Sequence, residues 1–166
     1  MSFQVGDFVF HPAHGVGHIV RLEEKRFVRE KARLYYEVST PKSTIWVPVE
    51  TYEAVGLRQV TAKYDLARYR NVLKSRPAAL EKDHHKRQRE LADRLKQGSF
   101  QAVCEVVRDL TARGWRKPLN EADGALLRRA RENLCQEWAA SQGVSVVEAT
   151  QEVEGLLREA RQAYMV

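Results

Sequence analysis

Cysteine is scarce in this 166-residue sequence, and long apolar runs are missing. Cys104 and Cys135 show no CxxC spacing and lie in helix-like apolar segments, so we expect small buried side chains in a reducing compartment rather than metal ligands. No apolar run approaches the roughly 20 residues that span a bilayer. The N-terminal residues lack the charged segment and long apolar core of a signal peptide. These absences predict a cytoplasmic protein with no membrane partner.

Motifs of the common enzyme classes are also missing. The sequence contains no GxSxG, HExxH, Walker or GxGxxG motif. Residues 15–17 (Gly-Val-Gly) are too few to cradle a phosphate, and they lie between predicted strands rather than at the start of a helix. We therefore predict that the protein is not an enzyme and holds no cofactor.

Histidines form the one pattern that suggests a metal. His11, His14 and His18 are spaced i, i+3, i+7, but a Pro-Gly turn interrupts them. No cysteine or nearby carboxylate completes the usual set of four ligands. His84 and His85 are adjacent on a predicted helix and therefore point to different sides. We predict histidines in turns and no metal site.

Charge is abundant and unevenly distributed. A hydrophobic content of 43% and a charged content of 30% indicate a globular protein of one or two domains with a true core. The formal net charge is +6, and residues 59–76 contain five Lys or Arg against one acid, Asp65, which gives a local charge of +4. A basic protein of this kind fits an anionic partner without requiring one.

The first sixty residues have the alternating pattern of strands. Short runs rich in β-branched and aromatic residues recur between turns that contain Gly and Pro. In the third run, Leu34, Tyr36 and Val38 face one way, and Tyr35 and Glu37 face the other. The predicted strands cover residues 8–11, 16–22, 33–39, 44–47 and 57–60. They predict a small bent sheet or half-open barrel.

After residue 60, apolar residues recur with a period of 3.6, which predicts helices. The predicted helices cover residues 64–74, 83–95, 100–113, 120–140 and 145 onward. Their predicted N-caps are Asp83, Ser99, Asn120 and Ser145, the last in a capping box with Glu148. We predict an α+β protein with a β domain over residues 1–60 and a compact all-helical domain over residues 61–166.

Two tryptophans are candidates for partner contacts. Trp46 alternates with Ile45 and Val47, so it faces outward if those two face the core. An outward tryptophan on a strand is a typical anchor for a partner, and the alternative is that another part of the protein covers it. Trp115 follows the third predicted helix beside two cations, and it is either a surface contact or, as we prefer, a lid over the helical core.

Residues 82–96, KDHHKRQRELADRLK, are the most basic stretch of the helical part. Leu91 and Leu95 share one helix face, and cations spaced three or four residues apart share another. Such a helix packs through one face and offers charge to a polyanion through the other. The alternative is an ordinary solvated face with acidic partners of its own.

Six short segments spread over nearly the whole chain occur in a familiar order. They are residues 3–7 (FQVGD), 11–17 (HPAHGVG), 47–49 (VPV), 55–58 (VGLR), 102–110 (AVCEVVRDL) and 127–134 (LRRARENL). Together they resemble the CarD/CdnL family of bacterial transcription regulators. The N-terminal part alone also resembles the polymerase-binding module of transcription-repair coupling factors.

The resemblance implies both partners and a mechanism. In this family a Tudor-like β domain binds the RNA polymerase β subunit by strand addition at a sheet edge, which fits residues 44–48. A helical domain contacts promoter DNA at the upstream edge of the bubble, where a tryptophan acts as a wedge in the minor groove. We therefore expect a monomer, held at the nucleoid by polymerase, that changes the stability of the open complex. The alternative is a polymerase-bound module without effective DNA contact or wedging.

The resemblance also assigns residues. Lys25, Trp46 and Pro48 correspond to polymerase contacts. The wedge position falls on His84, whose smaller and partly charged ring should open DNA less well than tryptophan. The basic residues that correspond to DNA contacts are Lys86, Arg87 and Arg89, with Arg128 and Arg129 available further along the chain. Alone, the protein should bind DNA weakly and without sequence preference.

Overall fold

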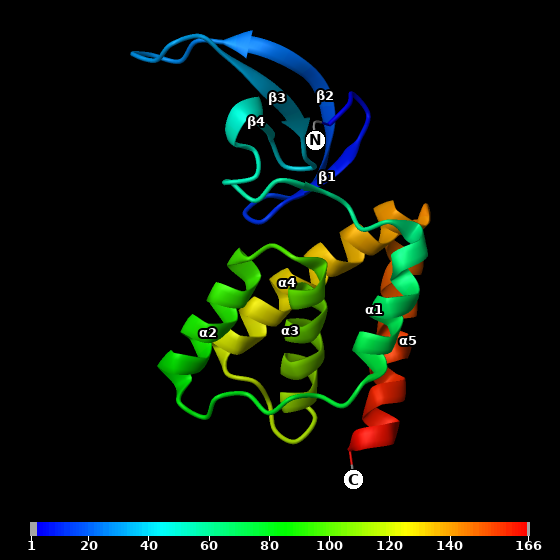
Figure 1. Cartoon of the computed structure of the whole chain (residues 1–166). Coiled ribbons are helices and arrows are strands. Elements are labelled where there is room, and N and C mark those ends of the chain that lie inside the picture. The colour runs from blue at the N-terminus through cyan, green and yellow to red at the C-terminus, as the bar shows by residue number, and fades with distance from the viewer. Residues whose placement is uncertain (1–2, 166) are drawn as a thin grey trace. The chain divides into compact units, whose positions relative to one another are not determined.

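The computed structural model describes residues 3–165, and the chain divides into two compact units whose boundary in the sequence falls between Val60 and Thr61. The first unit consists of a β-sheet and the second of helices (Figure 1). The predicted α+β class is therefore confirmed. Within residues 3–165, no helix is both long enough and apolar enough to cross a membrane.

The first unit is an open antiparallel sheet of five strands with the order β4-β3-β2-β1-β5. A register shift in β2, between Ile19 and Arg21, interrupts its pairing with β3, and such bulges increase the bend of a sheet. The strands are β1 (Phe8–His11), β2 (Gly15–Lys25), β3 (Arg33–Ser39), β4 (Thr44–Pro48) and β5 (Arg58–Gln59), and a short 3-10 helix, η1 (Val49–Thr51), follows β4.

One face of this sheet forms a small aromatic and aliphatic core. Tyr36 is fully buried, its hydroxyl accepts a hydrogen bond from the Phe3 amide at 3.1 Å, and the two rings meet edge to face. Strand β3 pairs with β4 in regular register, as alternating side chains require, but burial departs from this alternation at two positions, because Leu34 is exposed and Tyr35 is buried. Phe27 accounts for the second difference, since its ring packs edge to face against Tyr35 at a centroid distance of 5.3 Å.

The second unit consists of five α-helices. They are α1 (Leu66–Lys74), α2 (His84–Lys96), α3 (Phe100–Arg113), α4 (Glu121–Gln142) and α5 (Val146–Tyr164), and a 3-10 turn, η2 (Lys63–Asp65), precedes α1. Helix α1 lies beside α5, and α3 packs against α4 (Figure 1). The apolar stripes predicted from the 3.6-residue period form one continuous core.

Trp138 on α4 lies in the middle of this helical core and is fully buried. Its indole N–H donates to Gln142 Oε1 at 3.1 Å and to Glu152 Oε1 at 2.9 Å. Burial raises the pKa of Glu152, but hydrogen bonds from Arg70 and Trp138 outweigh this effect and leave the pKa below its usual range. Cys104 and Cys135 are both buried, as predicted, and they form no disulfide with each other; burial raises the pKa of Cys135.

The predicted N-caps fix where the helices begin. The side chains of Asp83, Ser99, Asn120 and Ser145 each accept a hydrogen bond from the amide three residues further on. The capping box at Ser145 is formed only in part, because Glu148 Oε1 contacts the Ser145 hydroxyl at 3.2 Å instead of its amide. These local bonds set the ends of the helices that carry the basic residues described next.

Candidate functional site

Strand β4 is an edge of the five-stranded sheet, so one side of its backbone has no strand partner within residues 3–165. At the turn before it, the Thr40 amide donates to the Ser43 carbonyl at 2.8 Å, which is a hydrogen-bonded pair of the same ladder. Such pairs alternate with non-hydrogen-bonded pairs in an antiparallel ladder. The pairs that contain Trp46 and Pro48 are therefore of the second kind, and their backbone groups point to the open edge. Pro48 offers only a carbonyl there.

Trp46 lies on the outer face of this edge strand. Its side chain is 37% exposed, whereas the next residue, Val47, is 3% exposed. This confirms that Trp46 faces away from the core. The ammonium of Lys25, at the end of β2, lies 4.3 Å from the centroid of the Trp46 ring. The structure thus brings together two of the three predicted polymerase contacts, Lys25 and Trp46, and the third, Pro48, lies on the same edge strand as Trp46.

A shallow groove of about 370 Å³ runs beside β4. It is lined by β4 itself and by His11, His14 and Val55. The two histidine rings lie 4.7 Å apart, and burial, followed by the charge of His14, lowers the pKa of His11. The groove gives the open edge of β4 a partly apolar floor on which side chains of an added strand could rest.

The histidines of the β unit do not gather around one point. His11 Nδ1 accepts the Ala13 amide at 3.0 Å, while the His18 ring packs against Phe8 at 6.3 Å. Across residues 3–165, no group of three or more His, Cys, Asp and Glu side chains is placed to hold a metal ion.

His84, at the predicted wedge position, is the first residue of α2 and is exposed. Asn120 Oδ1 accepts the Asp123 amide at 2.7 Å, which turns the Asn120 amide nitrogen toward His84 Nδ1 at 3.1 Å. Arg87 Nη2 lies 3.5 Å from the same ring nitrogen. Because both neighbours are donors, Nδ1 acts as the acceptor and the ring proton belongs on Nε2. His84 is thereby joined by a hydrogen bond to Asn120, the N-cap of α4.

Arg87 is buried, with 2% of its surface exposed. Its Nη2 lies 2.9 Å from Asp123 Oδ2, and its Nη1 donates to the carbonyls of Glu81 at 3.0 Å and Lys82 at 3.2 Å. This position corrects the prediction that Arg87 contacts DNA, because the guanidinium is already occupied and out of reach of a phosphate. Arg87 instead fastens α2 to α4 and to the segment before α2.

Two of the predicted DNA contacts on α2, Lys86 and Arg89, are exposed cations. Lys86 Nζ lies 3.5 Å from Glu81 Oε2, an exposed pair of the kind that contributes little stability. Arg89 faces solvent and makes no ion pair with any residue in the described part of the chain. The Lys86 amide holds the pKa of the capping Asp83 below its usual range, helped by the charges of His85, Arg89 and His84. The start of α2 therefore presents a cationic surface.

Arg128 and Arg129 lie on α4 and are exposed. Arg128 lines a groove of about 280 Å³ with Arg131, Cys135 and residues of α5. Between residues 3 and 165, no hydrogen bond or ion pair joins either arginine to α2. The predicted DNA contacts thus fall into two groups, one at the start of α2 and one along α4.

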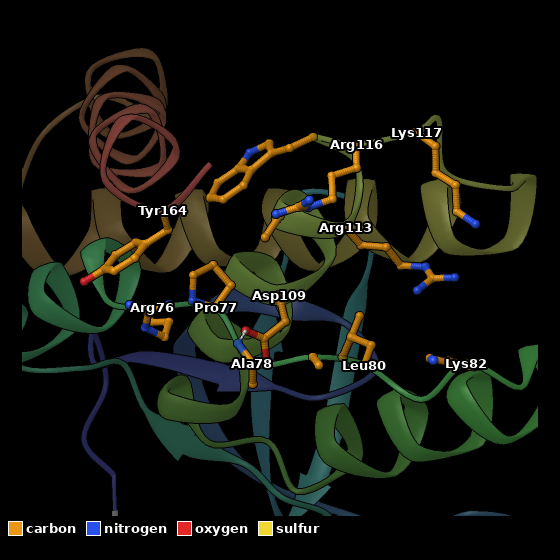
Figure 2. A pocket seen from close by; sticks show the side chains of 13 residues that line it. Arg76, Pro77, Ala78, Leu80, Lys82, Asp109, Arg113, Arg116, Lys117 and Tyr164 are labelled. Carbon is orange, nitrogen blue, oxygen red and sulfur yellow. Dashed lines mark hydrogen bonds between the residues drawn. The ribbon is translucent and has the colours of Figure 1, made fainter. Parts of the chain in front are cut away.

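A third group of cations was missed by the sequence predictions. Lys82, Arg113, Arg116 and Lys117 line a cleft of about 640 Å³ in the helical unit, together with Trp115 (Figure 2). Because Trp115 lines an open cleft, the surface-contact alternative fits it better than the lid. One feature of the sequence could have indicated this group: cations directly precede both Pro77 and Pro118. These two prolines are far apart in the chain, so the sequence alone did not show that the cations lie together.

Comparisons with known proteins match both units. Residues 3–61 match the CarD-like/TRCF RID domain, and residues 68–154 match the CarD C-terminal domain. A relative from Bacillus subtilis (strain 168), YdeB, is 30% identical over 144 residues, which cover 86% of this chain and 94% of YdeB. Its name describes a candidate transcription factor.

An RID-type sheet followed by a CarD-type helical unit defines a class of transcription factor, and RID domains are known for interaction with RNA polymerase. The chain belongs to the CarD/CdnL family of bacterial transcription regulators.

Proposed function

We propose that the edge of β4 binds the β subunit of RNA polymerase by strand addition. The observation that carries this proposal is that the backbone N–H and C=O of Trp46 point to an open sheet edge while its side chain is exposed. An added strand would bond to these backbone groups and rest side chains in the groove beside β4. Lys25 would keep the indole of Trp46 in place through its contact with the ring.

The helical unit, in the same proposal, contacts promoter DNA at the upstream edge of the bubble. Lys86 and Arg89 supply phosphate contacts from α2, and Arg128 and Arg129 supply them from α4. His84 lies against the minor groove, where its ring, held by Asn120, fills less space than a tryptophan wedge would. Such contacts carry little sequence information, so the protein alone binds DNA weakly and in a salt-dependent manner.

Attachment to polymerase makes this weak DNA contact effective. Once the β unit is bound, the helical unit meets DNA at a high local concentration, and no strong affinity of its own is needed. The protein then acts as a monomer, found with polymerase on the nucleoid in the cytoplasm, and lengthens the life of the open complex. The outcome is transcription regulation without enzymatic chemistry.

A second candidate function is a polymerase-bound module that hardly touches DNA. Two observations favour it: Arg87 is buried, and the His84 ring nitrogen is engaged by Asn120. Both observations reduce the number of side-chain groups on α2 that are available to contact a DNA duplex. The exposed Lys86 and Arg89 favour the first candidate.

The experiment that tests the proposed function is capture of the full chain by an immobilised lobe of the polymerase β subunit. We expect saturable binding that survives raised salt, since edge hydrogen bonds and an aromatic anchor depend little on charge. Absence of binding by the folded chain would contradict the proposal and the second candidate together.

A further inference from the structure

A cleft of about 640 Å³ opens in the helical unit (Figure 2). Its walls come from the segment between α1 and α2, the end of α3 with the loop that follows, and the last turn of α5. Small-molecule sites in proteins typically have volumes of about 300–1,000 Å³. The cleft is therefore of a size that suits a ligand rather than a single ion.

The cleft is strongly cationic. Five Lys or Arg residues line it, against the single carboxylate of Asp109. That carboxylate is 2% exposed and already neutralised, with Arg108 Nε at 2.8 Å and Arg94 Nη1 at 3.8 Å. Lys82, Arg116 and Lys117 are exposed and form no ion pair with any residue from 3 to 165. The cleft thus offers several uncompensated positive charges to an anion.

The apolar part of the cleft includes two aromatic side chains. Trp115 and Tyr164 both line the cleft, and each is half-buried. The Arg76 guanidinium lies over the Tyr164 ring at 4.9 Å. The Trp115 indole N–H has no acceptor among the described residues, in contrast to the buried indole of Trp138. Trp115 therefore presents an unused ring and donor at a place that is open to a ligand.

The wall of the cleft formed by the segment between α1 and α2 is held at both ends. Asp109 Oδ1 accepts the Ala78 amide at 3.0 Å, which fixes one end of the segment on α3. Arg87, through its bonds to the carbonyls of Glu81 and Lys82, fixes the other end on α2. The cleft is therefore preformed, and a ligand would not have to order this wall.

We propose that this cleft binds a nucleotide unit, with its base against Trp115 and its phosphate held by Arg116 and Lys117. A flat aromatic wall beside cations is the arrangement that proteins use for single nucleotides and unpaired strands, because the base stacks and the phosphate pairs with charge. Duplex DNA satisfies only the charges, since its bases are stacked inside. A free nucleotide and a nucleotide of a melted strand share this chemistry.

The test follows the tryptophan indole signals of the isolated full chain in a nitrogen–proton correlation spectrum. The chain has three tryptophans, and Trp115→Phe identifies the signal that belongs to Trp115. The probes are ATP, a short oligo-dT strand, inorganic pyrophosphate and a blunt duplex. We expect ATP, oligo-dT or both to shift the Trp115 signal saturably, and pyrophosphate and duplex to shift it less. The probe with the higher affinity identifies the source of the nucleotide.

Charge-matched variants complete the test. Arg116→Ala combined with Lys117→Ala should weaken the tighter nucleotide probe at least about tenfold, the effect of losing charge-assisted hydrogen bonds. Lys31→Ala combined with Lys42→Ala removes two exposed charges from the β unit, outside the proposed DNA contacts, and should leave that affinity unchanged. The proposal is overturned if neither ATP nor oligo-dT shifts Trp115, if pyrophosphate binds as tightly, or if both double variants weaken binding equally. Polymerase is absent, so failure here leaves the proposed polymerase contact standing.

Discussion

The guanidinium of Arg87 lies 2.9 Å from the carboxylate of Asp123, and the two side chains are only 3% and 1% exposed. They come from α2 and α4 and are 36 positions apart in the sequence. Asp123 also lies 3.8 Å from Arg113 Nε and is contacted by the Gln88 side-chain amide. Arg87, although it belongs to the basic segment, thus holds the helical unit together and is not available to bind an external anion such as a DNA phosphate.

Replacing Arg87 with methionine should therefore destabilise the protein. Loss of one member of a buried ion pair leaves the other charge desolvated, which costs about 3–5 kcal/mol of unfolding free energy. Urea denaturation of Arg87→Met would measure this loss. Arg89→Met, which removes an exposed arginine from the same helix, is the control and should change the unfolding free energy by less than about 0.5 kcal/mol. Equal stability of the two variants would mean that Arg87 does not hold the helices.

The stability that Asp83 contributes as the N-cap of α2 should depend on pH. The Lys86 amide keeps the pKa of Asp83 below its usual range. The folded-state pKa is thus lower than the unfolded value of about 4, so the cap stabilises the protein above that value and loses this effect as pH falls through the folded-state pKa. Asp83→Asn keeps a cap without titrating. The difference in urea midpoint between wild type and Asp83→Asn should shrink between about pH 5 and pH 2. A constant difference would show that Asp83 does not titrate in this way.

Trp46 should dominate the polymerase contact. Trp46→Ala is expected to weaken binding to the β lobe by about 2 kcal/mol or more, roughly 30-fold, as for other aromatic anchors. Lys25→Ala removes a rim charge and should cost about 1 kcal/mol or less. Val5 is 63% exposed and does not line the groove beside β4, so Val5→Ala is the control. Titration calorimetry with the β lobe measures all three, and equal affinities of Trp46→Ala and Val5→Ala would argue against the β4 edge.

Exposed cations on α2 should set the salt dependence of DNA binding. Each phosphate contact contributes about one unit to the slope of log affinity against log salt. Lys86→Ala combined with Arg89→Ala should therefore lower the slope by about two. Lys31→Ala combined with Lys42→Ala removes two exposed charges from the β unit and should leave the slope unchanged. Fluorescence anisotropy with a labelled duplex measures both slopes, and equal slopes would exclude α2 from the DNA contact.

Features that depend on neighbouring residues were predictable from the sequence. The caps at Asp83, Ser99 and Asn120 need only an acceptor side chain and an amide three residues away, and all three occur as predicted. The outward position of Trp46 follows from simple alternation in a short strand.

Features that depend on distant residues were not predictable. The basic segment indicated that Arg87 is a cation but not that Asp123 buries it, because the partner belongs to another helix. The cleft around Trp115 likewise forms only when three separate segments pack together. Family resemblance predicts that His84 occupies the wedge position, which stays a prediction, and the hydrogen bond between His84 and Asn120 became visible only in the folded structure.

The most direct measurement of the central claim is the lifetime of a promoter open complex after competitor challenge, with and without the protein. We expect wild type to lengthen the lifetime, Trp46→Ala to lose this effect, and His84→Trp to lengthen the lifetime further by restoring a flat wedge. His85→Trp, on the next position of the same helix, should behave as wild type. An open complex whose lifetime is the same with and without the wild-type protein would contradict the account.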